Sequence, residues 1–115
     1  MSNYEKVYDI IDQEKDFLLK LTQEVVKTPS VNPKLEKNEK LNNEPAVQDI
    51  IEKALIDEGF SIDRWDVFED RPNVIGTKKG NEEKSLILNG HIDVVPTGDL
   101  SGWSVDPFGG EIKDG

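Results

Sequence analysis

The spacing of apolar residues predicts a long amphipathic helix near the start of the chain. Between residues 3 and 27, apolar side chains recur at helical intervals and form one face. Ser2 and Glu5 have the spacing of a capping box at the start of this helix. Pro29 predicts its end, because proline disfavours helix at the residue before it.

A second apolar stripe predicts another helix over residues 45–58. Pro45 suits the first turn, where its missing N–H is harmless, and Gly59 suits the left-handed position just past the end. The segment between the two helices, residues 28–45, is rich in proline, asparagine and lysine and has no periodic apolar face. We expect it to be an exposed, mobile loop.

Beyond Gly59 the pattern changes to short extended stretches separated by turn signals. Strands are predicted at residues 60–67, 73–77 and 85–88. The last contains Leu-Ile-Leu, a continuous apolar run that indicates burial on both faces. The order of elements predicts an α/β fold, with two N-terminal helices packed on a mixed β-sheet.

Composition and charge narrow the classes of partner. The chain has 115 residues, enough for one small domain, and its formal net charge is −10. Such an acidic chain repels nucleic-acid phosphates and anionic membranes, so no nucleic acid and no membrane is expected as a partner. The start of the chain lacks a signal-peptide pattern, which predicts a cytoplasmic protein. Because cysteine is absent, a metal site would need nitrogen and oxygen ligands.

His91 and Asp93 are the candidate functional residues. His91 is the single histidine of the sequence, and it follows the apolar strand predicted at 85–88. In open α/β sheets, ligands bind just beyond the carboxyl ends of strands. If the backbone is extended here, Asp93 points to the same side as His91. An imidazole that binds a metal needs an acceptor on its other ring nitrogen, and Asp93 could supply it.

The pair alone leaves other interpretations open. His-x-Asp is common by chance, and Asn89-Gly90 is a strong signal for a type I′ hairpin turn. In that case residues 86–88 and 92–95 would pair, and the chain would be a small helix–hairpin interaction domain. Trp103 and Phe108 would then be ordinary core aromatics.

A longer set of motifs is more specific than the pair. The motifs are Thr-Pro-Ser-Val-Asn-Pro at 28–33, Arg-Pro-Asn-Val-Ile-Gly at 71–76, Gly-His-Ile-Asp-Val-Val-Pro at 90–96, Trp103, Asp-Pro-Phe at 106–108 and Asp-Gly at 114–115. Together they resemble the aminoacylase-like metallohydrolases. That family includes acetylornithine deacetylase, succinyl-diaminopimelate desuccinylase, carboxypeptidases and dipeptidases. The resemblance covers essentially the whole chain.

The resemblance implies an enzyme. His91 would bind one of two zinc ions, for which cobalt or manganese could substitute, and Asp93 would orient His91 as part of the catalytic machinery. The reaction would be hydrolysis of a C–N amide bond in an N-acyl amino acid or small peptide, of the deacetylase, desuccinylase or dipeptidase type. The metal would activate water and polarise the carbonyl. The intact enzyme is expected to be a homodimer.

The resemblance also implies that residues 1–115 are the incomplete opening part of a catalytic domain. A lid and dimerisation domain, the bridging Asp, the general-base Glu and further metal ligands are expected beyond Gly115. The chain alone is therefore expected to be inactive, and marginally stable or oligomeric. The alternative is a non-catalytic product, either a truncated remnant or a small interaction module.

Overall fold

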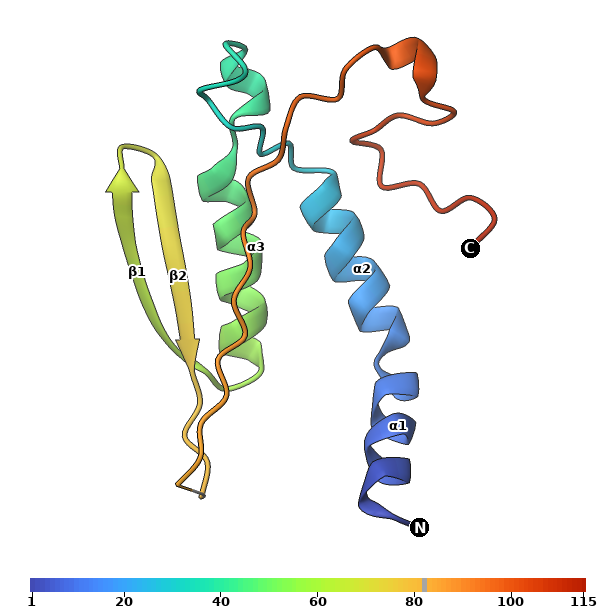
Figure 1. The fold of residues 1–115 in the computed structure, drawn as a ribbon, viewed down its shortest axis with the longest axis vertical. Helices are drawn as coiled ribbons and strands as arrows, with labels where there is room; N and C mark the ends of the chain where they lie inside the picture. The colour runs from blue at the N-terminus through green and yellow to red at the C-terminus, as the bar shows by residue number, and fades with distance from the viewer. Residues whose placement is uncertain (82) are drawn as a thin grey trace.

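The computed structural model describes residues 1–81 and 83–115 (Figure 1). Its elements in order are α1 (Asn3–Gln13), α2 (Lys15–Val26), the 3-10 helix η1 (Glu39–Leu41), α3 (Glu44–Asp57), β1 (Ser61–Phe68), β2 (Arg71–Thr77) and the 3-10 helix η2 (Leu100–Gly102). The hairpin β1–β2 packs against α3, and α2 stands on the other side of α3 (Figure 1). This arrangement confirms the predicted α/β class.

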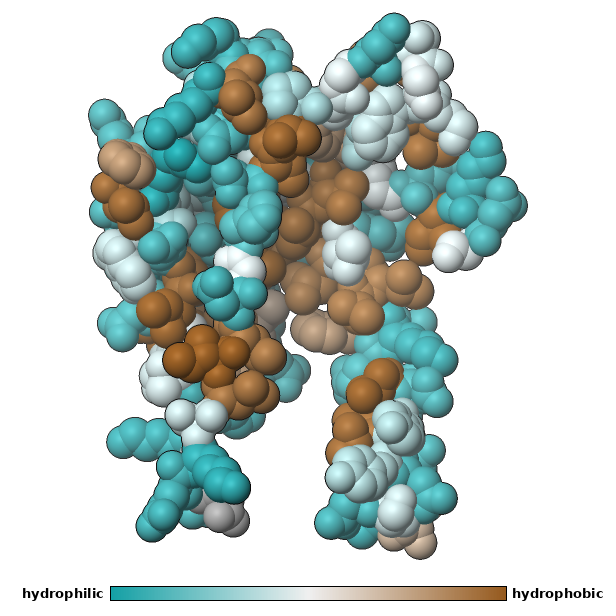
Figure 2. Space-filling model, viewed as in Figure 1, coloured by the Kyte–Doolittle hydropathy of each residue, from teal (hydrophilic) through white to brown (hydrophobic). Residues whose placement is uncertain are grey.

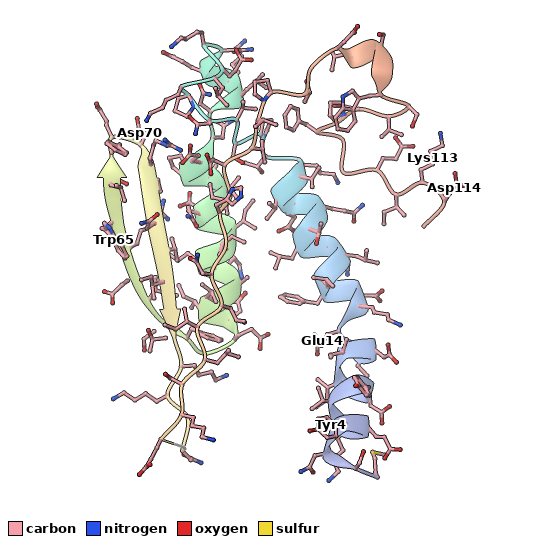
Figure 3. The ribbon with its side chains drawn as sticks, in the orientation of Figure 1. Tyr4, Glu14, Trp65, Asp70, Lys113 and Asp114 are labelled. Atoms are coloured by element: carbon pink, nitrogen blue, oxygen red, sulfur yellow. The ribbon has the colours of Figure 1, made fainter. Side chains whose placement is uncertain are left out.

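The first predicted helix is interrupted at Glu14, where ψ is 5° and α1 gives way to α2 (Figure 3). The prediction of one continuous helix is therefore wrong. The capping box at Ser2 and Glu5 does form, with the Glu5 amide 3.2 Å from the Ser2 hydroxyl. No residue of α1 is buried, so no tertiary contact requires the two helices to be collinear.

The helix α3 and the hairpin follow their local signals. Pro45 lies in the first turn of α3, and Gly59 follows its end with a φ of 80°. The strands β1 and β2 pair antiparallel, and Asp70 turns the chain between them with a φ of 56° (Figure 3). Gly76 on β2 lets the sheet approach α3, because a Cβ there would lie 3.0 Å from both methyl groups of Leu55.

The core lies where the loop after α2 meets the start of α3 and the start of β2. Val31 and Val47 are 1% and 0% exposed. Gln48, also buried, donates a hydrogen bond to the Pro72 carbonyl at 3.0 Å. The loop at 28–45 was predicted to be exposed and mobile, but Ser30 and Val31 are buried within it. The prediction of an exposed loop is therefore wrong for Ser30 and Val31.

The strand predicted at residues 85–88 does not form. Its central residue, Ile87, is 86% exposed, and its apolar neighbours on both sides are equally exposed. Within the described residues, this stretch has no strand beside it, so its backbone lacks the ladder that defines a strand. Figure 2 shows hydrophobic surface on this face of the molecule, some of it in the hollow between α3 and α2.

The Asn89-Gly90 hairpin is contradicted as well. Gly90 is not among the residues with positive φ, which a type I′ turn requires at this position. Instead, Val94 forms a parallel bridge with Val31. In the ranges 1–81 and 83–115, no helix has the length and apolar character needed to cross a membrane.

Candidate functional site

The segment that carries His91 and Asp93 is fixed to the loop after α2. The Asn32 amide donates to the Val94 carbonyl at 2.9 Å, and the Val94 amide donates to the Ser30 carbonyl at 3.0 Å. The Ser30 hydroxyl adds a bond to the Ile92 carbonyl at 2.6 Å. Three hydrogen bonds within three residues hold the backbone on either side of Asp93, so its position is set by the loop.

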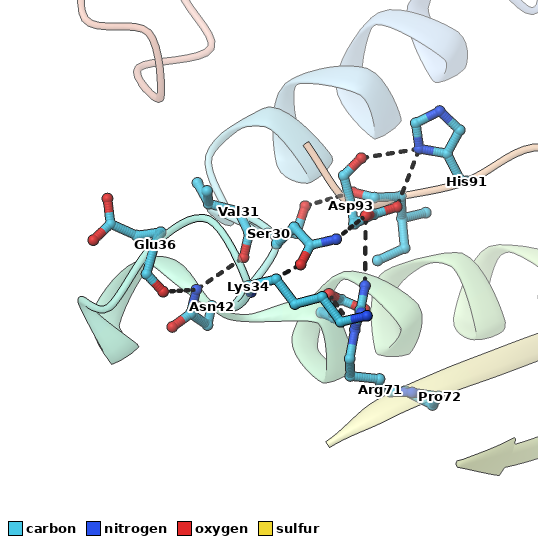
Figure 4. Close-up of polar contacts among 12 residues, drawn as sticks. Ser30, Val31, Lys34, Glu36, Asn42, Arg71, Pro72, His91 and Asp93 are labelled. Atoms are coloured by element: carbon cyan, nitrogen blue, oxygen red, sulfur yellow. Dashed lines mark hydrogen bonds and ion pairs between the residues drawn. The ribbon is translucent and has the colours of Figure 1, made fainter. Parts of the chain in front are cut away.

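The same loop is held from its other edge. The Val31 amide donates to the Leu41 carbonyl at 2.8 Å, and the Asn42 side chain donates to the Val31 carbonyl at 2.8 Å (Figure 4). The buried Val31 side chain anchors the loop in the core. Hydrogen bonds thus hold residues 30–32 between the segment just before α3 and the segment at 92–94.

His91 and Asp93 meet as the sequence spacing predicted. The imidazole Nδ1 of His91 lies 2.9 Å from the Asp93 carbonyl oxygen and 3.2 Å from Asp93 Oδ1 (Figure 4). Both neighbours are acceptors, so Nδ1 carries the hydrogen in the neutral ring and Nε2 keeps its lone pair. The His91 side chain is 83% exposed and is not packed among apolar groups.

The other carboxylate oxygen of Asp93 faces two donors. Oδ2 accepts from the Asn32 side-chain amide at 2.9 Å and from Arg71 Nη2 at 3.5 Å. The Asn32 hydrogen bond, followed by the nearby charges of Arg71 and His91, holds the pKa of Asp93 below its ordinary value, although partial burial opposes this. Asp93 is therefore an anion with both oxygens engaged.

Arg71 is itself oriented by Glu44 at the start of α3. Arg71 Nε lies 2.9 Å and 3.1 Å from the two carboxylate oxygens of Glu44, whose side chain is only 7% exposed. A glutamate in the first helical turn is also favoured by the helix dipole. We define the Asp93 network as Asn32, Glu44, Arg71, His91 and Asp93, of which Figure 4 labels Arg71, His91 and Asp93.

Sequence reasoning named two members of this network and missed the roles of the other three. Asn32 and Arg71 stood in motifs of the family resemblance, without a function. Glu44 had no signal beyond its place before Pro45. A polar residue beside proline in a loop is a weak indicator, so the convergence of these side chains is visible only in the fold.

The geometry fits His91 as one ligand of a metal ion. Its side chain is exposed, no polar contact reaches Nε2 from the described residues, and Nδ1 faces the carbonyl and a carboxylate oxygen of Asp93, as in many metal-binding histidines. Among the described residues, no three His, Cys, Asp or Glu side chains lie close enough to hold a metal. Since a catalytic zinc takes about three protein ligands, the rest of its ligand set would have to come from elsewhere.

An apolar hollow of about 460 Å³ opens beside the site, between the end of α2 and the segments at 92–97 and 103–108. Trp103 and Phe108 line it together with Val25 and Val94. Trp103 donates its indole N–H to the Thr97 carbonyl at 2.9 Å and stays 47% exposed, so it is not a core residue here.

Comparison with known proteins identifies similar enzymes. The chain is similar to N-formyl-4-amino-5-aminomethyl-2-methylpyrimidine deformylase of Bacillus subtilis, with 33% identity over 108 residues, covering 91% of this chain and 24% of that protein. The enzyme of the same name from Halalkalibacterium halodurans is 32% identical over 118 residues, covering 100% of this chain and 26% of that protein. Succinyl-diaminopimelate desuccinylase of Cereibacter sphaeroides is 41% identical over 98 residues, covering 83% and 23%.

The chain thus spans about a quarter of the length of the curated relatives it matches. No family model matches the chain, and no solved structure matches it.

Proposed function

Because the chain belongs to the aminoacylase-like metallohydrolases, the family of these desuccinylase and deformylase relatives, we propose that its protein hydrolyses a C–N amide bond with the help of bound metal. The observation that carries the proposal is the His91–Asp93 pair: an exposed imidazole with Nδ1 held 3.2 Å from a carboxylate oxygen. It lies inside the motif on which the family resemblance rests.

The proposed substrate is a small N-acylated amine or amino acid. One relative is named for removing a formyl group and another for removing a succinyl group, so the bond common to both names joins an acyl carbon to nitrogen. A dipeptide contains the same kind of bond and remains within the proposal. The acidic surface of the chain, with a net charge of −10, favours a small ligand over a polyanion.

The residues of this chain would supply one arm of the metal site. His91 would bind through Nε2, while Asp93 accepts the Nδ1 hydrogen and holds the ring in one orientation. Zinc, or cobalt or manganese in its place, would supply Lewis-acid activation of the scissile carbonyl. We also propose that the intact protein is a homodimer, as the resemblance implies.

Two substitutions test the proposal in the full-length protein. Replacement His91→Ala should lower metal content and reduce hydrolysis of N-formyl, N-acetyl and N-succinyl amines by at least about 100-fold, because a ligand is lost. Asp93→Asn should reduce the rate of hydrolysis by about 10- to 100-fold. Asp63→Asn on β1, an exposed position, is the matched control and should leave both readouts unchanged. Wild-type turnover in His91→Ala would refute the proposal.

The alternative is a non-catalytic interaction module. It is favoured by one observation, the single candidate metal ligand among the described residues. Full metal occupancy and turnover in the wild type, both lost in His91→Ala, would exclude it.

A further inference from the structure

Two segments that are distant from Asp93 in sequence converge on one of its carboxylate oxygens. Asn32 comes from the loop after α2, and Arg71 comes from the first residue of β2. Both donate to Oδ2, at 2.9 Å and 3.5 Å, while Oδ1 is left to face His91 Nδ1 at 3.2 Å (Figure 4). The two carboxylate oxygens therefore have separate tasks.

We propose that Asn32 and Arg71 are positioning residues that fix the carboxylate plane of Asp93 and thereby the orientation of the His91 ring. The proposal rests on the proposed function for its catalytic consequence. Its structural content stands on the contacts alone.

The need for these contacts follows from the torsional freedom of aspartate. The terminal torsion of a carboxylate has a broad, roughly two-fold well, so one hydrogen bond on Oδ1 does not fix the plane. Two donors on Oδ2 restrict that rotation and keep Oδ1 toward the ring. Without them the carboxylate could turn away, and His91 Nδ1 would keep its contact with the Asp93 carbonyl at 2.9 Å but lose the contact with Oδ1 at 3.2 Å.

Arg71 is suited to this task because Glu44 fixes the orientation of its guanidinium group. The carboxylate of Glu44 accepts from Nε with both oxygens, and Nη2 of the same planar guanidinium reaches Asp93. Glu44 is buried at the start of α3. Two ion pairs, Glu44–Arg71 and Arg71–Asp93, therefore connect the carboxylate beside the imidazole to the core. The order of contacts is Glu44, Arg71, Asp93 and His91.

The variant Asn32→Asp separates positioning from general structure. The Asn32 Oδ1 atom accepts from the Lys34 amide at 2.9 Å, and an aspartate keeps that acceptor and the shape of the turn. What changes is the other end, where a donor to Asp93 becomes a carboxylate facing a carboxylate. Arg71→Lys keeps the charge and loses the fork, whereas Arg71→Met loses both.

A matched control is available on the same hairpin. Arg64 on β1 also contacts two carboxylates, with Nη1 at 2.5 Å from Asp49 and 2.7 Å from Glu52. It does not contact Asp93. Arg64→Met therefore removes a comparable pair of ionic contacts from α3 and the hairpin without touching the Asp93 network.

The test uses the full-length protein with two readouts. In the metal-free protein with the imidazole neutral, the ¹⁵N shifts of the assigned His91 ring report the hydrogen bonding of Nδ1. Cobalt titration followed by visible absorption reports affinity. Asn32→Asp and Arg71→Met should change the Nδ1 shift, because the contact with the charged Oδ1 is lost, and should weaken cobalt binding by about 10- to 100-fold. Arg71→Lys should fall between them and the wild type, and Arg64→Met should match the wild type.

A double-variant cycle completes the test. In an Asp93→Ala background, Asn32→Asp should cause no further loss of cobalt affinity, because its effect passes through Asp93. Equal losses in both backgrounds would overturn the proposal, as would wild-type ¹⁵N shifts in both Asn32→Asp and Arg71→Met. The milder Arg71→Lys variant provides the ¹⁵N comparison if a stronger substitution prevents folding.

The two proposals fail separately. A changed Nδ1 shift in Asn32→Asp, together with absent metal binding and hydrolysis in the wild type, would support the positioning role and refute the hydrolase. Unchanged ¹⁵N shifts in the variants of an active, metal-loaded enzyme would refute positioning and leave the hydrolase intact.

Discussion

His91 and Asp93 follow the apolar stretch at residues 86–88 by a few positions, but the Asp93 network has its contacts made within the chain and the stretch does not. The network is packed beside Val31, which is 1% exposed, and its carboxylates are engaged by donors within the chain. The stretch carries Ile87, which is 86% exposed. Among the described residues, every buried polar side-chain atom has a hydrogen-bond partner. The chain therefore completes its polar contacts here but leaves this apolar surface uncovered.

The difference shows that two separate requirements apply: Asp93 needs a few hydrogen-bond donors, whereas the apolar stretch at residues 86–88 needs neighbouring segments to bury it. Hydrogen bonds are directional and are satisfied by a few correctly placed atoms, such as those of Asn32 and Arg71. Burial of an apolar strand needs neighbours on both faces and at both edges. Residues 86–88 have the sequence of such a strand without those neighbours.

The largest expected effect compares a charge at each place. Val47→Asp in this 115-residue chain buries an unpaired carboxylate beside the core and should destabilise the fold by about 3–5 kcal/mol. Ile87→Asp places the same charge in solvent and should change the free energy of unfolding by less than about 0.5 kcal/mol. Urea denaturation measures both. Equal losses would show that residues 86–88 are covered in solution, contrary to the structure.

A smaller effect distinguishes the ion pair of the network from an exposed one. Glu44→Gln leaves Arg71 with a weaker acceptor in a buried place and should cost about 2 kcal/mol. Asp49→Asn removes an exposed partner of Arg64 and should cost about 0.5 kcal/mol. The measurement is again urea denaturation. A loss for Asp49→Asn as large as that for Glu44→Gln would remove the distinction between the two pairs.

Glycine substitutions probe the same contrast through sterics. A Cβ at Gly76 would lie 3.0 Å from the Leu55 methyl groups and 3.2 Å from Phe60, so Gly76→Ala should cost about 1 kcal/mol. Gly90 has no atom within 4 Å of such a Cβ and lacks a positive φ, so Gly90→Ala should be nearly neutral. Thermal unfolding compares the two. A large loss of thermal stability in Gly90→Ala would instead support a hairpin turn at Asn89-Gly90.

The smallest expected effect is a pH dependence from Asp93, which is partly exposed. Its pKa in the folded state lies below the unfolded value of about 3.9, so the folded chain binds fewer protons there. The resulting stabilisation is complete above that unfolded value and is lost as the pH falls through the folded pKa. Metal-free wild type should therefore lose more stability than Asp93→Asn as urea denaturations move from pH ~5 to ~2. Parallel pH profiles would contradict the lowered pKa.

Local signals determined the elements that depend on neighbours in sequence. The capping box at Ser2, the proline and glycine that bound α3, and the strands of the hairpin appear where the pattern predicts them. Each is a short-range preference of backbone or cap. The two-residue spacing of His91 and Asp93 likewise sufficed to bring the ring to the carboxylate.

Tertiary structure alone decided the burial of Val31 and the exposure of residues 86–88. It also brought Asn32 to Asp93 across 61 positions of sequence, and Arg71 across 22. The physical reason is that a helix cap or a tight turn is satisfied by atoms a few residues away. Strand pairing, apolar burial and the meeting of charges depend on which distant segments the fold places beside them.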